Sequence, residues 1–228
     1  MFLTSDHKIK TRPLAIAALF VLAMVGAGIA GGDQVLFLML RGWDCGFFRF
    51  LGAVFATKVW LVATVLVMMV FYIKKSLKTK IQYKNQRNKF SFVAIMRDFF
   101  EKTKTSYAFF TFCSVFMASL LTGVLKIVLG RARPIFFEAL DLTGFFPFRL
   151  DWAFHSMPSG HATASFAGLV MLGLLAPRVR PVTWTLGVVI GVSRVCVGAH
   201  WPSDVLLGAF IGMVMADLVK ATLKKYIH

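Results

Sequence analysis

Three short polar clusters in the second half of the chain contain the residues that could perform chemistry. The first runs from Lys126 to Arg133 and is followed by Pro134, which disfavours helix at the residue before it, so a helix should end there. Lys126 and Arg133 are seven residues apart and would share one helix face, with Gly130 between them leaving room for a ligand. Two converging cations suit a phosphate, because Arg presents a planar fork of donors to its oxygens. Taken alone, the cluster is better explained by cations that snorkel from a helix end.

The second cluster is Pro158-Ser159-Gly160-His161, followed by a run of small residues. A Ser-Gly turn that leads into a helix offers exposed backbone N–H groups and the positive end of the helix dipole, which together bind anions. His161 would lie in the first turn of that helix, where it could reach the same ligand. The alternative for these four residues is an ordinary N-cap serine beside an incidental interfacial histidine.

The third cluster contains Arg194, His200 and Asp204. His200 and Asp204 are four residues apart at a predicted helix start, so the carboxylate could hold one ring nitrogen. Such a bond fixes the tautomer and frees the other nitrogen as a nucleophile or base. The alternative for Asp204 is a first-turn acid that the helix dipole favours. Arg194 falls inside an apolar segment, where an arginine is by default a functional residue.

Together the clusters supply several cations, a backbone anion site, two histidines and one orienting carboxylate. This inventory suits a phosphoryl group with a nucleophile on one side and an acid on the other. The sequence contains no metal-binding motif such as HExxH. Because Lys and Arg side chains already neutralise the charge of a phosphate, we expect neither a metal nor another cofactor.

At these residues the chain resembles the type-2 phosphatidic acid phosphatases. The family signature has three parts, and all of its fixed positions match in the family's order: Lys126, Arg133 and Pro134; Pro158, Ser159, Gly160 and His161; Ser193, Arg194, His200 and Asp204. These motifs span Lys126 to Asp204, whereas the first hundred residues match only in their helical pattern. Each part is a weak signal, but the three in order form a specific one.

The resemblance implies a bundle of six membrane helices whose site opens at the outer leaflet. It implies that His200 is the nucleophile and forms a phosphohistidine, that Asp204 orients it, and that His161 protonates the leaving oxygen. It further implies that the phosphoryl oxygens are held by Lys126, Arg133, Ser159, Gly160 and Arg194. The expected partners are the lipid bilayer and a membrane lipid phosphate; no obligatory protein partner is evident.

The composition indicates that these residues belong to an integral membrane protein. Of 228 residues, 58% are hydrophobic and 16% are charged, 24 are Phe, and the mean hydropathy is +0.73. A soluble domain is usually about 45–50% apolar and about 25% charged. The net charge of +16 would suggest nucleic acid in a soluble chain, but here the cations lie in short runs between apolar segments. We therefore expect a membrane partner and no nucleic acid.

Six apolar segments are candidates to cross the bilayer within one domain over residues 1–228. A span needs about 20 mostly apolar residues. The first candidate could instead be a cleavable signal peptide, but its apolar stretch of 19 residues favours a retained helix. The expected spans are residues 13–31, 51–73, 106–125, 162–176, 181–197 and 205–219.

The distribution of cations predicts the orientation. With six crossings, 18 of the 26 Lys and Arg residues fall on the side of the termini and six on the other. Positive charge marks the cytoplasmic side, so both termini should be cytoplasmic and loops 32–50, 126–161 and 198–204 should face outward. The short chain without further domains favours a bacterial enzyme, in the inner membrane with its site facing the periplasm.

The sequence leaves the roles of three further residues open. Arg131 is expected on the solvated surface, with contact to a headgroup as the alternative. His155 is expected in a solvated loop, with a rim contact as the alternative. Lys58 could snorkel outward or reach a headgroup.

The leading function is hydrolysis of phosphatidate, phosphatidylglycerol phosphate, undecaprenyl pyrophosphate or lipid A. A lipid phosphotransferase would use the same phosphohistidine, and a non-catalytic lipid-phosphate binder or transporter would not need a His–Asp pair.

Overall fold

The structure is a computed structural model that describes residues 2, 10–82, 92–223 and 226. Its described residues form helices and connecting loops, with one isolated antiparallel bridge between Arg131 and Phe145. The α-helices are α1 Thr11–Ala27, α2 Asp33–Arg41, α3 Gly46–Val54, α4 Thr57–Gln82, α5 Phe92–Thr103, α6 Tyr107–Leu129, α7 Pro134–Leu140, α8 Gly160–Leu175, α9 Arg180–Cys196 and α10 Pro202–Thr222. A π-helical turn over Gly28–Gly32 joins α1 to α2, and 3-10 turns lie at Trp152–Phe154 and Pro177–Val179.

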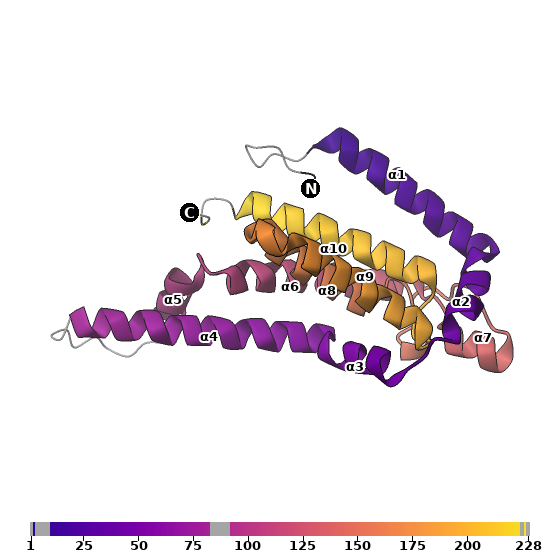
Figure 1. Ribbon diagram of the computed structural model, residues 1–228, viewed down its shortest axis with the longest axis horizontal. Helices are drawn as coiled ribbons and strands as arrows, with labels where there is room; N and C mark the ends of the chain where they lie inside the picture. Colours follow the sequence, from indigo (N-terminus) through magenta and orange to yellow (C-terminus); the bar gives the residue numbers. More distant parts are fainter. Residues whose placement is uncertain (1, 3–9, 83–91, 224–225, 227–228) are drawn as a thin grey trace.

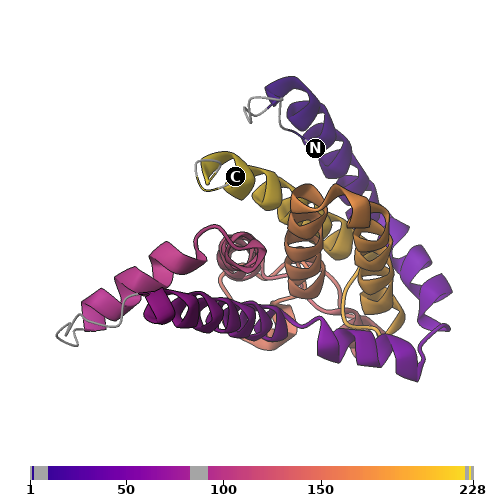
Figure 2. The same cartoon turned by 60° about the vertical axis from the view of Figure 1, so that its left-hand side comes forward.

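Helix α8 lies at the centre of the bundle, between α6, α9 and α10 (Figure 2). Its residues are mostly buried, and many are small, so the neighbouring helices approach closely. A side chain at Gly212 of α10 would lie 2.5 Å from the backbone oxygen of Thr163, and one at Gly208 would lie 2.7 Å from that of Ser159. The start of α8 is therefore held directly against α10.

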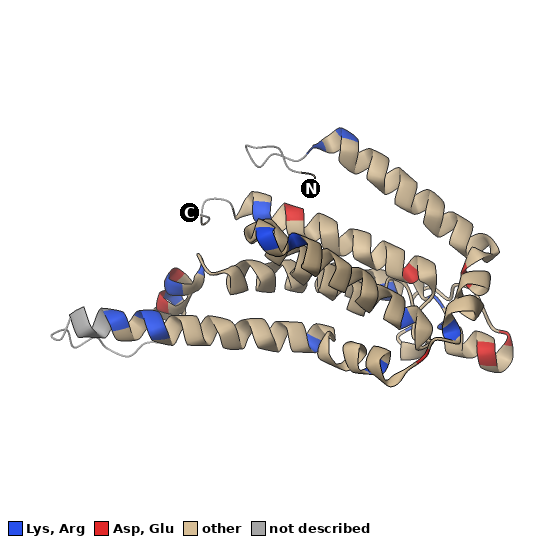
Figure 3. Cartoon of the chain, in the orientation of Figure 1, with Lys and Arg blue, Asp and Glu red and all other residues tan. Residues whose placement is uncertain are grey.

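Four helical segments are long and apolar enough to cross a membrane, and α8 is a shorter apolar helix. The four segments are Thr11–Arg41, Thr57–Lys78, Tyr107–Leu129 and Pro202–Thr222. Large apolar side chains remain exposed along α1, α4 and α6, as expected where lipid covers a helix. Lys and Arg gather towards the two ends of the bundle and are sparse between them (Figure 3). The chain is an integral membrane protein.

The two ends of the bundle differ in their contents. The start of α1, the end of α4, helix α5 and the end of α10 lie at one end, whereas α2, α3 and α7 lie at the other (Figure 1). The clusters of interest belong to the second end, where α6 and α9 finish and α8 and α10 begin.

The region between the first two expected spans differs from the sequence-based expectation. Residues 32–50, expected as an outer loop, form α2 and most of α3, and the second long helix begins at Thr57 rather than at residue 51. The polar Asp33 ended the apolar run in the sequence. In the fold Asp33 is the first residue of α2, and its charge is paired with Arg131.

Candidate active site

Each residue of the three clusters lies at the end of a helix or in the loop beside it. Lys126 is in the last turn of α6 and Arg194 in the last turn of α9. Arg133 caps α7, and His200 lies just before α10. Helix ends at one end of the bundle thus bring together residues that are up to 78 positions apart in the sequence, from Lys126 to Asp204.

Lys126 and Arg133 share an acceptor, as expected for two cations that converge on one space. Lys126 Nζ donates to the carbonyl oxygen of His155 at 2.6 Å, and Arg133 Nη2 donates to the same oxygen at 3.2 Å. Arg133 also donates to the carbonyl oxygens of Trp152 and Ala199, the latter directly before His200. Burial lowers the pKa of Arg133 to about 10, so it remains a cation at neutral pH.

Gly130 does not leave room for a ligand, contrary to expectation. It ends α6 in the left-handed conformation, with φ of 59°, which glycine adopts without strain. A side chain there would collide with the backbone of Phe146, whose N–H donates to the Gly130 carbonyl oxygen. The glycine therefore closes the helix and admits the following loop.

The start of α8 contains an N-cap serine, which agrees with the alternative interpretation of the Ser-Gly turn. Ser159 is fully buried and caps the helix, its Oγ accepting from the N–H of Ala162 at 3.4 Å. Its own backbone N–H donates to the carbonyl oxygen of Asp204, so this donor is not available to an anion. A methyl group at Gly160 would stand 3.7 Å from Lys126 Cε, which places the Gly160 backbone beside that cation.

Helix α3 contributes contacts that the sequence did not reveal. The carbonyl oxygen of Gly52 lies 3.1 Å from His161 Nε2, and that of Phe48 accepts from Arg194 Nη2 at 2.8 Å. Because a carbonyl can only accept, His161 carries its proton on Nε2. A Cβ at Gly52 would overlap the Arg194 guanidinium, so only glycine fits there without displacing it. Gly52 lies within α3, and its local sequence gave no indication of Arg194 as a neighbour.

His200 and Asp204 face one another without the expected hydrogen bond. His200 Nδ1 lies 3.8 Å from Asp204 Oδ2, beyond hydrogen-bonding range, and has no partner in the described part of the chain. His200 is 3% exposed, and burial lowers its pKa to about 3 against the opposing effect of Asp204. The imidazole is therefore neutral at physiological pH, which is the form that can attack a phosphorus atom.

The carboxylate of Asp204 is held by other donors. Its Oδ2 accepts from Ser156 Oγ at 2.5 Å and from the Trp201 N–H at 2.9 Å. Its Oδ1 accepts from Arg131 Nη1 at 2.8 Å. Asp204 lies in the first turn of α10, which also agrees with the alternative of a first-turn acid that the helix dipole favours.

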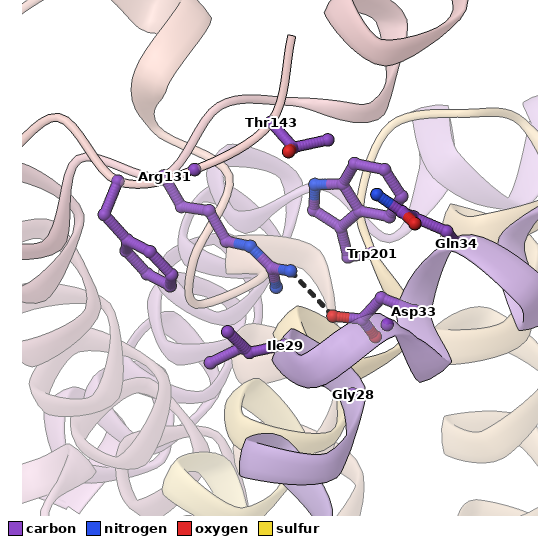
Figure 4. Close-up of a pocket in the computed structure, with 10 residues that line it drawn as sticks. Gly28, Ile29, Asp33, Gln34, Arg131, Thr143 and Trp201 are labelled. Carbon is purple, nitrogen blue, oxygen red and sulfur yellow. Dashed lines mark hydrogen bonds and ion pairs between the residues drawn. The ribbon is translucent and has the colours of Figure 1, made fainter. Parts of the chain in front are cut away.

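Arg131 is buried rather than solvated, which corrects the sequence-based expectation. It is 6% exposed and pairs with both Asp204 and Asp33, the latter at 2.7 Å from its Nη2 (Figure 4). The spacing of Arg131 from Lys126 along a helix could not show this burial, because α6 ends at Leu129 and Arg131 lies in the loop that follows. Asp33 was not identified as a site residue either.

The two other open residues have plain outcomes. His155 contributes its backbone oxygen to Lys126 and Arg133, while its ring contacts the carbonyl oxygen of Arg149. Lys58 is exposed in the first turn of α4.

The three cations retain donors for a ligand. Arg133 uses three of its five N–H groups, Arg194 uses two and Lys126 uses one of its three in bonds to the described residues. His161 lies within electrostatic range of all three. Such a site can take a dianionic phosphoryl group between a neutral histidine and a second histidine that holds a proton.

Comparison with known proteins agrees with this chemistry. A family model described as the PAP2 superfamily matches residues 105–227. A lipid A 1-phosphatase of Rhizobium johnstonii is 42% identical over 107 residues, which are 47% of this chain and 43% of the relative. An undecaprenyl-diphosphatase of Sulfolobus acidocaldarius is 36% identical over 104 residues, or 43% of this chain and 47% of the relative. The alignments thus span less than half of either relative.

The fold is also similar to a solved structure. It resembles a transmembrane PAP2-type phosphatidylglycerolphosphate phosphatase of Bacillus subtilis with a TM-score of 0.63 and 19% identity, over 93% of this chain and 96% of the other. The family model covers more than half of the chain and includes all three clusters, which confirms the resemblance drawn from the sequence. This chain belongs to the PAP2 superfamily.

Proposed function

We propose that this chain hydrolyses the phosphate of a membrane lipid through a phosphohistidine on His200. One observation carries the proposal: the buried His200 has its Nδ1 3.8 Å from Asp204 Oδ2, and Arg133 Nη1 donates to the carbonyl oxygen of Ala199, directly before it. Nucleophile, orienting carboxylate and charge-neutralising donors are then in one place, as phosphoryl transfer requires.

In the first step, the free Nε2 of His200 attacks phosphorus and forms a P–N bond. The P–O bond to the lipid breaks, and His161, doubly protonated when the dianionic phosphate is bound, donates its Nε2 proton to the departing alkoxide or phosphate. The bond from His161 Nε2 to the Gly52 carbonyl keeps that proton on the correct nitrogen before the substrate binds. Asp204 stabilises the positive charge that develops on His200.

In the second step, water attacks the phosphohistidine and the P–N bond breaks. His161, now without its proton, accepts one from the water, so both histidines return to their initial state. The products are inorganic phosphate and the lipid that carried it. Lys126, Arg133 and Arg194 hold the phosphoryl oxygens throughout, with Ser159 and Gly160 at the start of α8 beside them.

The relatives indicate which lipids to test first. The Rhizobium johnstonii protein is named a lipid A 1-phosphatase, and a second one from Rhizobium etli, 41% identical over 103 residues, has the same name. We propose lipid A as the first candidate substrate, followed by undecaprenyl pyrophosphate, phosphatidylglycerol phosphate and phosphatidate. A phosphoryl group at the leaflet surface is common to all four.

We further propose six crossings, with α8 and α9 as the additional spans, in a bacterial inner membrane. The start of α1 and the end of α10 lie at the same end of the bundle, as an even number of crossings requires (Figure 1). The excess of cations on that side supports a cytoplasmic location for both termini. The site at the opposite end would then face the periplasm.

The test is a phosphate-release assay with the purified full chain and the four lipids, with and without an added lipid or sugar acceptor. Phosphate release from at least one lipid, and its loss in His200→Ala, is the expected result. Transfer of phosphate to the acceptor with little free phosphate would instead favour a phosphotransferase. No turnover of any lipid, or equal turnover by His200→Ala, would contradict the proposal.

A further inference from the structure

A chain of buried charges connects the first two helices to the candidate nucleophile. Asp33 of α2 is 2% exposed, Arg131 is 6% exposed and Asp204 is fully buried. Arg131 joins the two carboxylates, with Nη2 at 2.7 Å from Asp33 Oδ2 and Nη1 at 2.8 Å from Asp204 Oδ1. Three buried charges in contact are expensive to desolvate, and hydrophobic residues of similar size would often be at least as stable. Stability alone therefore does not explain them.

The sequence Gly28–Gly32 brings Asp33 to this place. Gly31 has φ of 128°, a conformation that L side chains rarely adopt, and it breaks the helix between α1 and α2. A Cβ at Gly28 would lie 2.9 Å from Asp33 Oδ1 and 3.0 Å from Ser203 Cβ. The absence of a side chain at Gly28 lets the carboxylate reach the start of α10.

Asp33 also holds the start of α10 directly. Ser203 lies between His200 and Asp204 in the sequence, and both its N–H and its hydroxyl contact Asp33, at 2.9 and 2.5 Å. Arg131 Nη1 donates to Ser203 Oγ as well, at 2.7 Å. The segment that carries the His–Asp pair is thus tied to α2 at two points.

These contacts set the orientation of the Asp204 carboxylate. Arg131 occupies Oδ1, whereas Oδ2 faces His200 Nδ1 at 3.8 Å. If the Asp33 carboxylate were removed, the whole charge of Arg131 would act on Asp204. The guanidinium would also be free to move together with the Asp204 carboxylate. The distance and the field between Asp204 and His200 would then both change.

We propose that Asp33 is a positioning residue that, through Arg131 and Ser203, fixes the Asp204 carboxylate facing His200. The inference rests on the proposed function of His200 as nucleophile. Asp33 lies outside residues 105–227, which the family model matches, so this contact joins α2 to the common core. Asp33 touches no reacting atom in this proposal and acts only through its two partners.

The first test compares Asp33→Asn with the wild type in purified full-length protein. We expect kcat to fall on the order of 10-fold with KM within about twofold, since partners that orient a functional histidine in metal sites carry about 10–100-fold. The rate of phosphohistidine formation in a single turnover should fall by the same factor. The matched control is Glu138→Gln, which removes a carboxylate paired with Arg41 at the same end of the molecule. It should leave kcat unchanged.

The second test is rescue by a small carboxylate. Asp33 and Arg131 line a cavity of about 130 Å³ together with Gly28, Thr143 and Trp201 (Figure 4). In Asp33→Ala, sodium formate should enter beside Arg131 and raise kcat several-fold. Sodium chloride at equal ionic strength should not, and formate should not raise the kcat of the wild type or of Asp33→Asn, in which a side chain occupies the position.

The outcomes separate positioning from a purely structural role. The proposal is overturned if kcat of Asp33→Asn stays within twofold of the wild type. It is also overturned if the loss of kcat in Asp33→Asn disappears at temperatures well below the unfolding midpoint of that variant. The same holds if formate does not raise the kcat of Asp33→Ala. A wild type that hydrolyses no lipid phosphate would refute the proposed function and this inference with it. An active wild type with an equally active Asp33→Asn would refute only the inference.

Discussion

Arg131 and Asp204 form a buried ion pair, with Arg131 Nη1 2.8 Å from Asp204 Oδ1 and both side chains less than one-tenth exposed. The same guanidinium holds Asp33, so one cation balances two carboxylates where water is excluded. A buried charge left without a partner is strongly unfavourable. The fold of this end of the bundle therefore depends on a residue that lies between the motif positions Lys126 and Arg133.

Removing this cation should destabilise the protein. Arg131→Met leaves two buried carboxylates facing each other, and we expect the free energy of unfolding to fall by about 3–5 kcal/mol. The measurement is the unfolding midpoint in detergent micelles. Arg149→Met is the control, because Arg149 is exposed in the same loop region and its loss should change the free energy by about 0.5 kcal/mol or less. Equal midpoints for Arg131→Met and the wild type would show that the pair is not formed.

A substitution at Gly52 should impair phosphate binding without unfolding the protein. The added Cβ would meet the end of the flexible Arg194 side chain, which can move away at little cost to stability. Arg194 would then lose its place in the site, and a hydrogen bond to a charged group is worth about 1.5–3 kcal/mol. We expect kcat/KM of Gly52→Ala to fall by about 10–100-fold with an unchanged unfolding midpoint.

Gly46→Ala is the matched control in the same helix, since a Cβ there meets nothing within 4 Å. Its kcat/KM should equal that of the wild type. If Gly52→Ala were fully active, Arg194 would not be held where the structure has it or would not bind the substrate.

Turnover should not require a divalent metal. Lys126, Arg133 and Arg194 retain donors for the phosphoryl oxygens and supply the positive charge that a metal would otherwise contribute. Activity should survive excess EDTA and gain nothing from added magnesium. Loss of turnover on chelation, with recovery on adding Mg²⁺, would contradict this prediction.

The orientation in the membrane can be tested with reporter fusions. A fusion after Leu142, in the loop that follows α7, should report the outer side. Fusions after Lys104 and at the C-terminal His228 should report the cytoplasmic side. An alkaline phosphatase reporter is active outside and a fluorescent protein is bright inside, so each position receives both. A cytoplasmic signal from the fusion after Leu142 would mean that the site does not face the periplasm.

The sequence was sufficient for the parts of the site that depend on spacing within one helix end. His200 and Asp204 are four residues apart, and Ser159, Gly160 and His161 are contiguous, so the chain itself keeps them together. Helices α6, α8, α9 and α10 likewise follow their apolar runs closely. The local apolar pattern and the family signature were therefore enough to predict these helices and these neighbouring site residues.

Contacts between segments far apart in the chain could not be predicted in the same way. Asp33 and Arg131 are 98 positions apart, and Gly52 and His161 are 109 apart. Nothing in the local sequence of Arg131 distinguishes a buried guanidinium from a solvated one. The partner carboxylates decide its burial, and only the packing of α2 against α10 shows where they lie. The missing hydrogen bond between His200 and Asp204 has the same origin, because Asp204 is shared with Arg131, Ser156 and Trp201.

The two histidines should respond differently to the leaving group. His161 holds a proton on Nε2, and general acid help is typically worth about 10²–10⁴-fold, but only when the leaving oxygen needs a proton. A lipid alkoxide needs one and a nitrophenolate does not. His161→Ala should therefore form the phosphohistidine much more slowly from a lipid phosphate monoester, but at nearly the wild-type rate from nitrophenyl phosphate, provided that the wild type accepts this substrate. His200→Ala should form it from neither substrate, because it lacks the attacking nitrogen.

Trapping of the covalent intermediate gives the second readout for these variants. Acid-labile phosphate should be found on the wild type and on His161→Ala incubated with nitrophenyl phosphate, but not on His200→Ala. Label on the His200→Ala protein would mean that another group is the nucleophile. Equal losses in the rate of phosphohistidine formation from both substrates for His161→Ala would mean that this side chain binds the phosphoryl group rather than protonating the leaving oxygen, since binding is needed equally for either ester.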